Sequence, residues 1–221
     1  MEKVLVNYIK IRKGIFVMTA IMSLGLGYLI GCLQPAVLIS RIKNVNLKKE
    51  GTGNLGATNT TFVLGKKAGM FVLFFDIFKS FLSFKLAKWL FPKLVIAGIL
   101  ASIGTILGHC FPVFLDFQGG KGLAAFGGLI LAYSPWMFAM IVTVGTVLMF
   151  VCNTGVIAPF VGCIAFPAMV YYTGHDLLET AAVLAASAII YSTHLSNFRM
   201  ARKREDVVST RDFVNKVFGK K

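Results

Sequence analysis

Residues 122–175 include no acidic residue, no lysine and no arginine. Pro135 and the turn-forming sequence 153–155 divide this stretch into a short apolar segment (123–134) and two longer ones (135–152 and 156–173). A membrane-spanning helix needs about 20 predominantly apolar residues. The stretch is too long for two such helices and short for three full ones. It therefore predicts two ordinary membrane helices and one abbreviated segment.

The rest of the chain is similarly apolar. Hydrophobic residues make up 57% of the sequence, charged residues 14%, and the mean hydropathy is +0.76. Such a chain cannot bury its apolar side chains in one small core, so lipid must solvate many of them. Four further spans are expected, at 15–40, 68–90, 94–115 and 177–193. We predict an all-α integral membrane protein: a bundle of about seven transmembrane helices in a single domain (1–206), with a basic cytoplasmic tail (207–221).

The basic residues predict an orientation. If 123–134 crosses the membrane, the loops 41–67, 116–122 and 153–155 and the C-terminal tail share one side, which holds most of the Lys and Arg residues. The positive-inside rule makes that side cytoplasmic. The basic N-terminus argues against this orientation. If segment 123–134 is re-entrant, the C-terminal tail lies on the opposite side of the membrane. Basic clusters beside apolar spans indicate anionic headgroups, so we expect a lipid bilayer and no nucleic acid as partner.

A glycine–lysine loop, Gly119-Gly120-Lys121-Gly122, opens directly into the apolar segment 123–134. Glycine N–H groups and a lysine at a helix N-terminus form an anion cradle, because the N–H groups and the helix dipole favour phosphate. It is not a Walker loop, since no Ser or Thr follows Lys121. The alternative is a flexible connecting loop.

Two other polar clusters interrupt the apolar sequence. Residues 51–59 supply the side chains of Thr52, Asn54, Thr58 and Asn59, which fit either a ligand site or a turn followed by a helix N-cap. His194 and Asn197 share a helix face if the last span continues past 193; otherwise His194 is an interfacial residue. Proton transfer is the functional interpretation of a histidine near basic residues.

Two further groups have structural interpretations. Asp76 and Lys79 lie three residues apart within a span and favour a structural ion pair facing the bundle interior. The four cysteines are expected to be small buried hydrophobes without disulfides (Cys32, Cys110, Cys152 and Cys163). The sequence shows no paired carboxylates and no metal-ligand cluster, so we expect neither cofactor nor metal. Any chemistry would depend on positioning and electrostatics.

Three motifs carry a family resemblance: GTGNLGATN (51–59), GHCFPVFLDFQGGKG (108–122) and HLSNFRM (194–200). They resemble motifs of the acyl-phosphate-dependent glycerol-3-phosphate acyltransferases, the PlsY family. The resemblance implies a seven-helix protein of the bacterial plasma membrane with its active site at the cytoplasmic face. It also implies phospholipid biosynthesis by acyl transfer from acyl-phosphate to the 1-hydroxyl of glycerol 3-phosphate, giving lysophosphatidic acid and phosphate.

The matching positions suggest roles for particular residues. The resemblance assigns catalysis to His194, Asn197, Thr52 and Lys121. It assigns substrate binding to a second group: Gly53, Asn54, Asn59, His109, Gly119, Gly120, Gly122 and Arg199.

Some positions depart from the family pattern. Phe62 occupies the place of a phosphate-binding arginine, Leu195 replaces another arginine, and Thr52 replaces a serine. Arg204 and Asp206 stand where glycine and glutamate are expected. Another base (Lys66, Lys67 or Arg199) would have to substitute, or the acceptor differs, or the activity is weak. The alternative functions are a transporter or channel for a small anion or lipid, and a non-catalytic relative. The sequence leaves the oligomeric state open.

Overall fold

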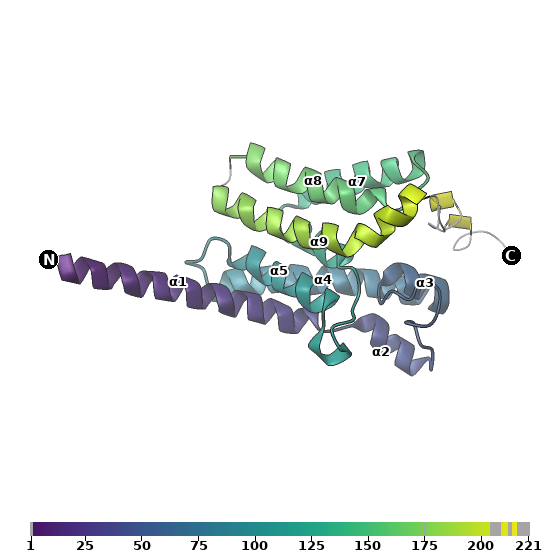
Figure 1. Ribbon diagram of the computed structural model, residues 1–221, viewed down its shortest axis with the longest axis horizontal. Helices are drawn as coiled ribbons and strands as arrows, with labels where there is room; N and C mark the ends of the chain where they lie inside the picture. Colours follow the sequence, from purple (N-terminus) through teal and green to yellow (C-terminus); the bar gives the residue numbers. More distant parts are fainter. Residues whose placement is uncertain (1, 175, 204–208, 212–213, 216–221) are drawn as a thin grey trace.

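The computed structural model describes residues 2–174, 176–203, 209–211 and 214–215 (Figure 1). Within these residues the ordered elements are all helical. They are α1 (Glu2–Gly31), α2 (Pro35–Ile42), α3 (Ala57–Leu64), α4 (Lys66–Leu90), α5 (Ala97–Cys110), the 3-10 turn η1 (Val113–Leu115), α6 (Leu123–Tyr133), α7 (Pro135–Val151), α8 (Ile157–Tyr172) and α9 (Leu177–Lys203).

Seven of these helices form the predicted membrane bundle. Segments in α1, α5 and α9 are long and apolar enough to cross a bilayer, and α6, α7 and α8 are shorter apolar helices. Helix α4 has 25 residues and several charged side chains. Helices α2 and α3 have eight residues each, about 12 Å, and cannot span. The predicted all-α integral membrane fold is confirmed.

The first apolar span, predicted as one helix over 15–40, is divided. Helix α1 ends at Gly31, and Pro35 begins α2 as a separate helix after an extended Gln34. Proline has no N–H to donate but is well accommodated in the first turn of a helix, so it starts α2 rather than merely kinking α1. Pro135 begins α7 in the same way, with the Ser134 hydroxyl accepting a hydrogen bond from the Met137 N–H at 3.3 Å.

Helices α1 and α5 pack backbone to backbone. A Cβ at Gly27 or Gly31 of α1 would overlap the carbonyl of Ala101 or Thr105 on α5. Gly27 and Gly31 form a GxxxG pair, a spacing that lets two membrane helices approach closely. The facing helix carries a second pair with the same spacing, Gly104 and Gly108, which also pack on the α1 backbone.

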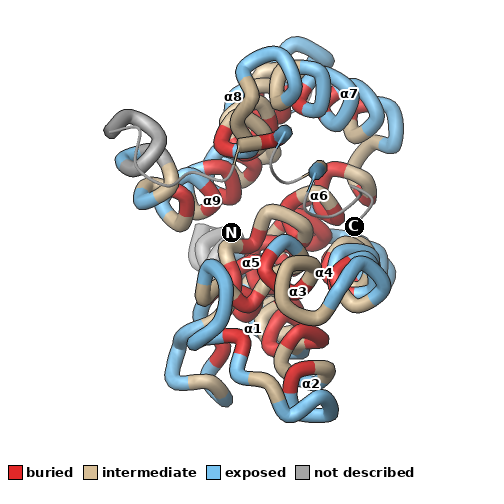
Figure 2. Tube along the Cα trace, turned by 90° about the vertical axis from the view of Figure 1, so that its right-hand side faces the viewer, coloured by how far each residue is buried: buried red, intermediate tan, exposed pale blue. Residues whose placement is uncertain are grey.

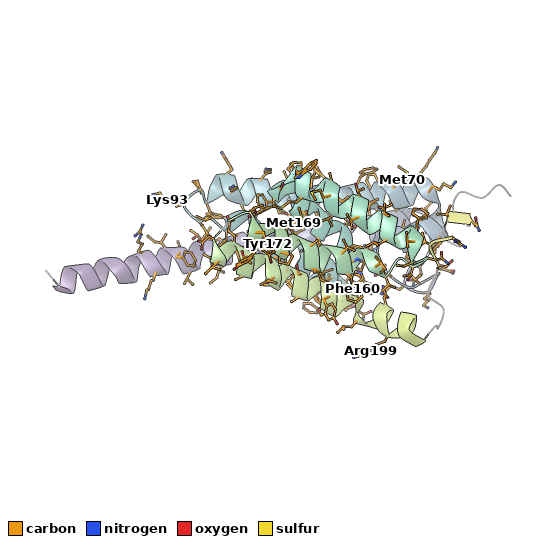
Figure 3. The ribbon with its side chains drawn as sticks, turned by 90° about the horizontal axis from the view of Figure 1, so that it is seen from above. Met70, Lys93, Phe160, Met169, Tyr172 and Arg199 are labelled. Atoms are coloured by element: carbon orange, nitrogen blue, oxygen red, sulfur yellow. The ribbon has the colours of Figure 1, made fainter. Side chains whose placement is uncertain are left out.

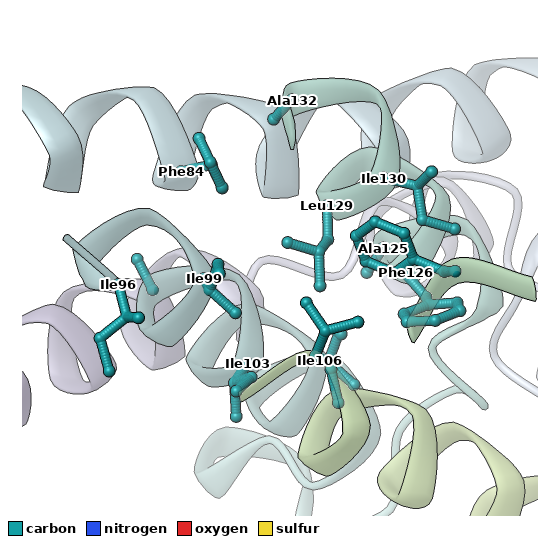
Figure 4. Close-up of a cluster of buried hydrophobic side chains, with 14 of the residues drawn as sticks. Phe84, Ile96, Ile99, Ile103, Ile106, Ala125, Phe126, Leu129, Ile130 and Ala132 are labelled. Carbon is teal, nitrogen blue, oxygen red and sulfur yellow. The ribbon is translucent and has the colours of Figure 1, made fainter. Parts of the chain in front are cut away.

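The bundle has two groups of helices (Figure 2). Helices α1 to α5 form one group, α7 to α9 form the other, and α6 lies between them. The core is a cluster of apolar side chains from α4 to α9, and its members on α4, α5 and α6 include Phe84, Ile99, Ile106, Phe126 and Leu129 (Figure 4). Many large apolar side chains outside it are exposed, as lipid-facing residues must be.

Helix α6 runs alongside part of α9, in the opposite direction. At its start the Thr193 hydroxyl of α9 donates to the Lys121 carbonyl at 2.8 Å. At its end the Tyr133 hydroxyl donates to the carboxylate of Glu179, near the start of α9, at 2.9 Å. Segment 123–134 is therefore a short helix antiparallel to α9. The loops 41–67, 116–122 and 153–155 lie at the same end of the bundle as the end of α9.

Three expectations change in detail. Helix α9 continues ten residues past 193, to Lys203, so His194 and Asn197 are helical rather than part of a tail. Cys152 is exposed, whereas Cys32 and Cys110 are buried as expected; all four thiols are free. Within the predicted tail, Thr210 is buried and its hydroxyl donates to the Met149 carbonyl of α7 at 3.0 Å.

Candidate active site

A cavity of about 650 Å³ opens between the two helix groups. Its polar end is lined by the side chains of Thr52, Asn54, Lys121, His194 and Asn197. Most of the remaining wall is apolar and comes mainly from α6, α7 and α8. The cavity is therefore amphipathic, with room for a polar head at one end and a hydrocarbon chain along the rest.

Lys121 is the cation of the polar end. Its ammonium group donates a hydrogen bond to the side-chain oxygen of Asn197 on α9. The Lys121 carbonyl is fixed by Thr193 of the same helix. Partial burial lowers the pKa of Lys121 from its ordinary value. The charge is only partly solvated, which strengthens its attraction for an anion.

The N-terminus of α6 faces the same space. Gly122 precedes the helix with φ +82°, a conformation that a residue with a side chain rarely adopts. Gly122, Leu123 and Ala124 all line the cavity. The first N–H groups of a helix have no partner within it, and the helix dipole favours negative charge there. Lys121 and these N–H groups together make this end of the cavity electropositive, which favours an anion.

Gly119 and Gly120 contribute differently from the expectation that their N–H groups form the cradle. The Gly119 N–H donates to the Cys110 carbonyl and the Gly120 N–H to the His109 carbonyl, each at 3.0 Å. Neither glycine lines the cavity. A Cβ at Gly119 would overlap the His109 carbonyl, and one at Gly120 would overlap the His109 ring. These glycines shape the loop, and the N–H groups that remain for a ligand are those that begin α6.

His194 presents a lone pair to the cavity. Its Nδ1 lies 2.9 Å from the Ile190 carbonyl. A carbonyl only accepts hydrogen bonds, so Nδ1 carries the proton and Nε2 carries the lone pair. The ring is buried and lines the cavity beside Asn197, one turn farther along α9. This arrangement suits a group that accepts or orients the proton of a substrate hydroxyl.

Loop 51–59 is organised by Asn59. The buried amide of Asn59 donates to the carbonyls of Leu47 and Glu50 at 3.0 and 3.1 Å, and its oxygen accepts from the Thr52 N–H at 2.7 Å. Asn59 and Gly53 do not line the cavity, whereas Thr52 and Asn54 do. The amide of Asn59 therefore holds the loop, and Thr52 and Asn54 are the residues placed to meet a ligand.

A buried charged cluster lies beside the polar end. The Lys79 ammonium is 2.8 Å from the Asp76 carboxylate and 3.0 Å from Nδ1 of His109. It also donates to the carbonyls of Gly31 and Leu33, at the end of α1. The ion pair expected within the bundle interior is present. Asp76 and His109 line the cavity, which the sequence indicated for His109 alone.

Phe62 occupies the position of the phosphate-binding arginine of the family pattern, and Arg199 is one of the bases suggested to replace it. Arg199 is exposed, does not line the cavity, and lies toward the same end of the bundle as Met70, opposite Lys93 (Figure 3). Phe62 of α3 lines the cavity itself. Phe62, which stands where the family pattern has an arginine, is therefore part of the cavity wall. Arg199, one of the bases suggested as a substitute for that arginine, is not.

The sequence reasoning missed the apolar wall of the cavity. Phe138, Ile141 and Met149 of α7 line it together with small residues of α8. Ala158 and Gly162 are four residues apart on α8. Small residues at this spacing let another element approach a membrane helix closely, so they were a usable signal. Among the residues with described structure, no three His, Cys, Asp or Glu side chains gather as metal ligands.

The fold and the site define an integral membrane protein with an amphipathic cavity within its helical bundle. A family model described as glycerol-3-phosphate acyltransferase matches residues 21–204. The chain belongs to the glycerol-3-phosphate acyltransferase family and is a membrane acyltransferase.

Individual relatives agree with this assignment. Proteins named glycerol-3-phosphate acyltransferase are 34% identical in Thermosipho melanesiensis (72% of this chain, 78% of the relative) and 34% in Bacillus cytotoxicus (80% and 89%). Crystal structures of the integral membrane acyltransferase PlsY superpose with TM-scores of 0.80 for a glycerol 3-phosphate form and 0.79 for a lysophosphatidic acid form. Each has 28% identity and covers 88% of this chain and 98% of the solved chain.

Proposed function

We propose that this enzyme transfers a fatty acyl group from acyl-phosphate to the 1-hydroxyl of glycerol 3-phosphate, giving lysophosphatidic acid and inorganic phosphate. The observation that carries the proposal is the amphipathic cavity. Its polar end combines a lysine, a helix N-terminus and a histidine with a free lone pair, and its apolar wall can take an acyl chain. Both parts of an acyl-phosphate are thereby accommodated in one site.

The residues at the polar end fit a direct transfer. The substrate hydroxyl donates to Nε2 of His194, and its oxygen attacks the acyl carbonyl carbon. A new carbon–oxygen ester bond forms, and the bond from that carbon to the phosphate oxygen breaks. Phosphate leaves with the electron pair, and Lys121 with the N–H groups of α6 stabilises its charge. The hydroxyl proton passes to His194 or directly to the departing phosphate.

The remaining polar residues orient the reactants. Asn197 holds the Lys121 ammonium toward the cavity. Thr52 and Asn54 supply a hydroxyl and an amide on the opposite wall, held there by Asn59. Reactants held in the attacking geometry need no covalent enzyme intermediate.

The polar end of the cavity faces the cytoplasm of a bacterial plasma membrane under this proposal. The basic residues Lys43, Lys48, Lys66 and Lys67 lie on loops or helix ends on that side of the bundle. The described basic side chains at the other end of α4 and in the loop after it are fewer: Lys85, Lys88 and Lys93. This asymmetry favours a cytoplasmic location for the cavity mouth, although the basic start of α1 lies at the opposite end (Figure 1).

The test is turnover by the purified full chain in lipid nanodiscs. Acyl-phosphate and glycerol 3-phosphate together should release inorganic phosphate and form an ester in equal amounts. Acyl-phosphate with other polyol phosphates gives the acceptor preference. Phosphate or lipid flux through proteoliposomes without ester formation would indicate a transporter. Binding of acyl-phosphate without product from any acceptor would indicate a non-catalytic relative.

A further inference from the structure

Lys79 is buried in α4, yet it contacts both the end of α1 and a residue of the cavity wall. Its ammonium is 2.8 Å from the carboxylate of Asp76, one turn earlier on α4. It donates to the carbonyls of Gly31 and Leu33 at 3.1 and 2.8 Å. Gly31 is the last residue of α1 and Leu33 lies in the link to α2, so neither carbonyl accepts a hydrogen bond within α1. The charge of Lys79 is therefore held in place from two sides.

The remaining contact of Lys79 determines the state of His109. An ammonium group only donates hydrogen bonds, so Nδ1 of His109, 3.0 Å away, accepts from it. The Asp76 carboxylate, which is an acceptor, lies farther from the same nitrogen, at 3.4 Å. The shorter contact with Lys79 favours the tautomer that carries its proton on Nε2. This tautomer is opposite to that of His194, whose Nδ1 carries the proton. The two histidines of the cavity thus present a donor and an acceptor.

His109 in turn supports the glycine–lysine loop. Nε2 lies so close to Gly120 that a Cβ there would overlap it. The His109 carbonyl accepts from the Gly120 N–H at 3.0 Å and from the Gln34 side chain at 2.8 Å. The next residue after Gly120 is Lys121. The placement of the Lys121 charge therefore depends on the orientation of the His109 ring and backbone.

We propose that Lys79 is a positioning residue that, anchored by Asp76 and the end of α1, fixes the ring of His109 in its Nε2–H tautomer beneath the glycine–lysine loop. Lys79 acts through His109 and has no direct contact with the reactants. The ring thereby offers Nε2–H as a hydrogen-bond donor at the cavity wall. Groups that support reactive residues commonly fix orientation and tautomer in this way.

The first experiment observes the ring nitrogens of histidine directly. The chain has three histidines, so ¹⁵N-histidine labelling of the full chain in nanodiscs gives a spectrum assignable by single substitutions. We expect His109 as the Nε2–H tautomer and His194 as the Nδ1–H tautomer. In Lys79→Met the His109 signals should no longer be those of the Nε2–H tautomer alone. A protonated ring or an Nδ1–H tautomer for His109 in the unaltered protein would overturn the proposal.

The second experiment is a kinetic double-mutant cycle. Lys79→Met should lower kcat/KM by about 10- to 100-fold, because small misplacements of reacting groups have effects of this size. In a His109→Ala background the same substitution should cost little further. Equal losses in both backgrounds would contradict action through His109. Lys79→Arg should recover part of the activity, because a guanidinium can still donate to Nδ1.

Lys85→Met is the matched control. Lys85 is on the same helix and donates to a helix-end carbonyl, that of Ala132, at 3.1 Å, but it lies farther along α4 and does not line the cavity. The substitution Lys85→Met should leave kcat/KM unchanged per folded molecule. The kinetic cycle rests on the proposed acyl transfer, whereas the ¹⁵N spectrum does not. A failure of the activity and a failure of the positioning role are therefore distinguishable.

Discussion

The ammonium group of Lys121 donates a hydrogen bond to the side-chain oxygen of Asn197, 76 residues later in the chain. This bond joins the loop before α6 to the last helix of the bundle. It also holds the site's cation at the N-terminus of α6, on the same cavity wall as His194. The two motifs that are far apart in the sequence become one site through this contact.

Loss of the Lys121 charge should weaken the reaction strongly. Lys121→Met keeps much of the side-chain volume but removes a charge-assisted hydrogen bond to phosphate, which contributes about 1.5–3 kcal/mol. We expect kcat/KM to fall by about 10- to 150-fold, measured as phosphate release. Lys93→Met is the control, since Lys93 is exposed at the opposite end of the bundle. An unchanged kcat/KM in Lys121→Met would refute the assigned role.

The reaction should lose activity at alkaline pH because of Lys121. Burial lowers the pKa of its ammonium below the ordinary value for lysine, about 10.4. The charged form binds phosphate, so kcat/KM is retained below the lowered pKa and declines as the pH rises through it. A profile of kcat/KM against pH measures this limb. In Lys121→Arg the alkaline decline should disappear, because a guanidinium stays charged.

The substitution Asn197→Asp adds a negative charge beside Lys121 while keeping the shape of the side chain at position 197. A carboxylate at 197 favours the charged form of Lys121, so the alkaline limb should move to higher pH. The same carboxylate competes with phosphate for the ammonium, so KM for acyl-phosphate should rise. A limb that stays in place in this variant would show that another group titrates.

The sequence predicted the helices well because their signals are local. Proline at 35 and 135, glycine at 122 and long apolar runs each act within a few residues. The anion site was predicted in part: Lys121, Gly122, His194 and Asn197 line the cavity together. The hydrogen bonds that occupy Gly119, Gly120 and Asn59 depend on residues brought close only by the fold. The exposure of Arg199 likewise follows from the direction of its helix face, so these details were not predictable.

The packing of α1 on α5 should be sensitive to one methyl group. Gly27→Ala places a Cβ against the Ala101 carbonyl, and α1 must move away from α5. Overpacking of this kind costs about 1–3 kcal/mol, so the midpoint of thermal unfolding in detergent should fall. Gly25→Ala is the control on the same helix, because a Cβ there meets nothing within 4 Å. Alanine favours a helix over glycine, so Gly25→Ala should be neutral or stabilising. Equal midpoints for the two variants would contradict the close approach.

Phe62 should limit the affinity for a phosphorylated acceptor. It lines the cavity near Thr58, on the wall that also carries Thr52 and Asn54. A glycerol 3-phosphate molecule brings a second phosphate into a cavity whose charged lining side chains are Lys121 and the paired Asp76, among the residues that the structure describes. Phe62→Arg adds a bidentate phosphate donor. KM for glycerol 3-phosphate should then fall by about 10-fold or more, given about 1.5–3 kcal/mol for such a bond.

The comparison with an uncharged acceptor makes this last prediction specific. With glycerol in place of glycerol 3-phosphate, Phe62→Arg should bring no gain, because there is no phosphate for the new guanidinium to bind. Phe62→Leu, which removes the ring without adding charge, should leave the preference between the two acceptors as it is. If Phe62→Arg instead lowers activity with glycerol 3-phosphate, the apolar ring itself contributes to binding. The acceptor of this enzyme would then be less polar at that position than glycerol 3-phosphate.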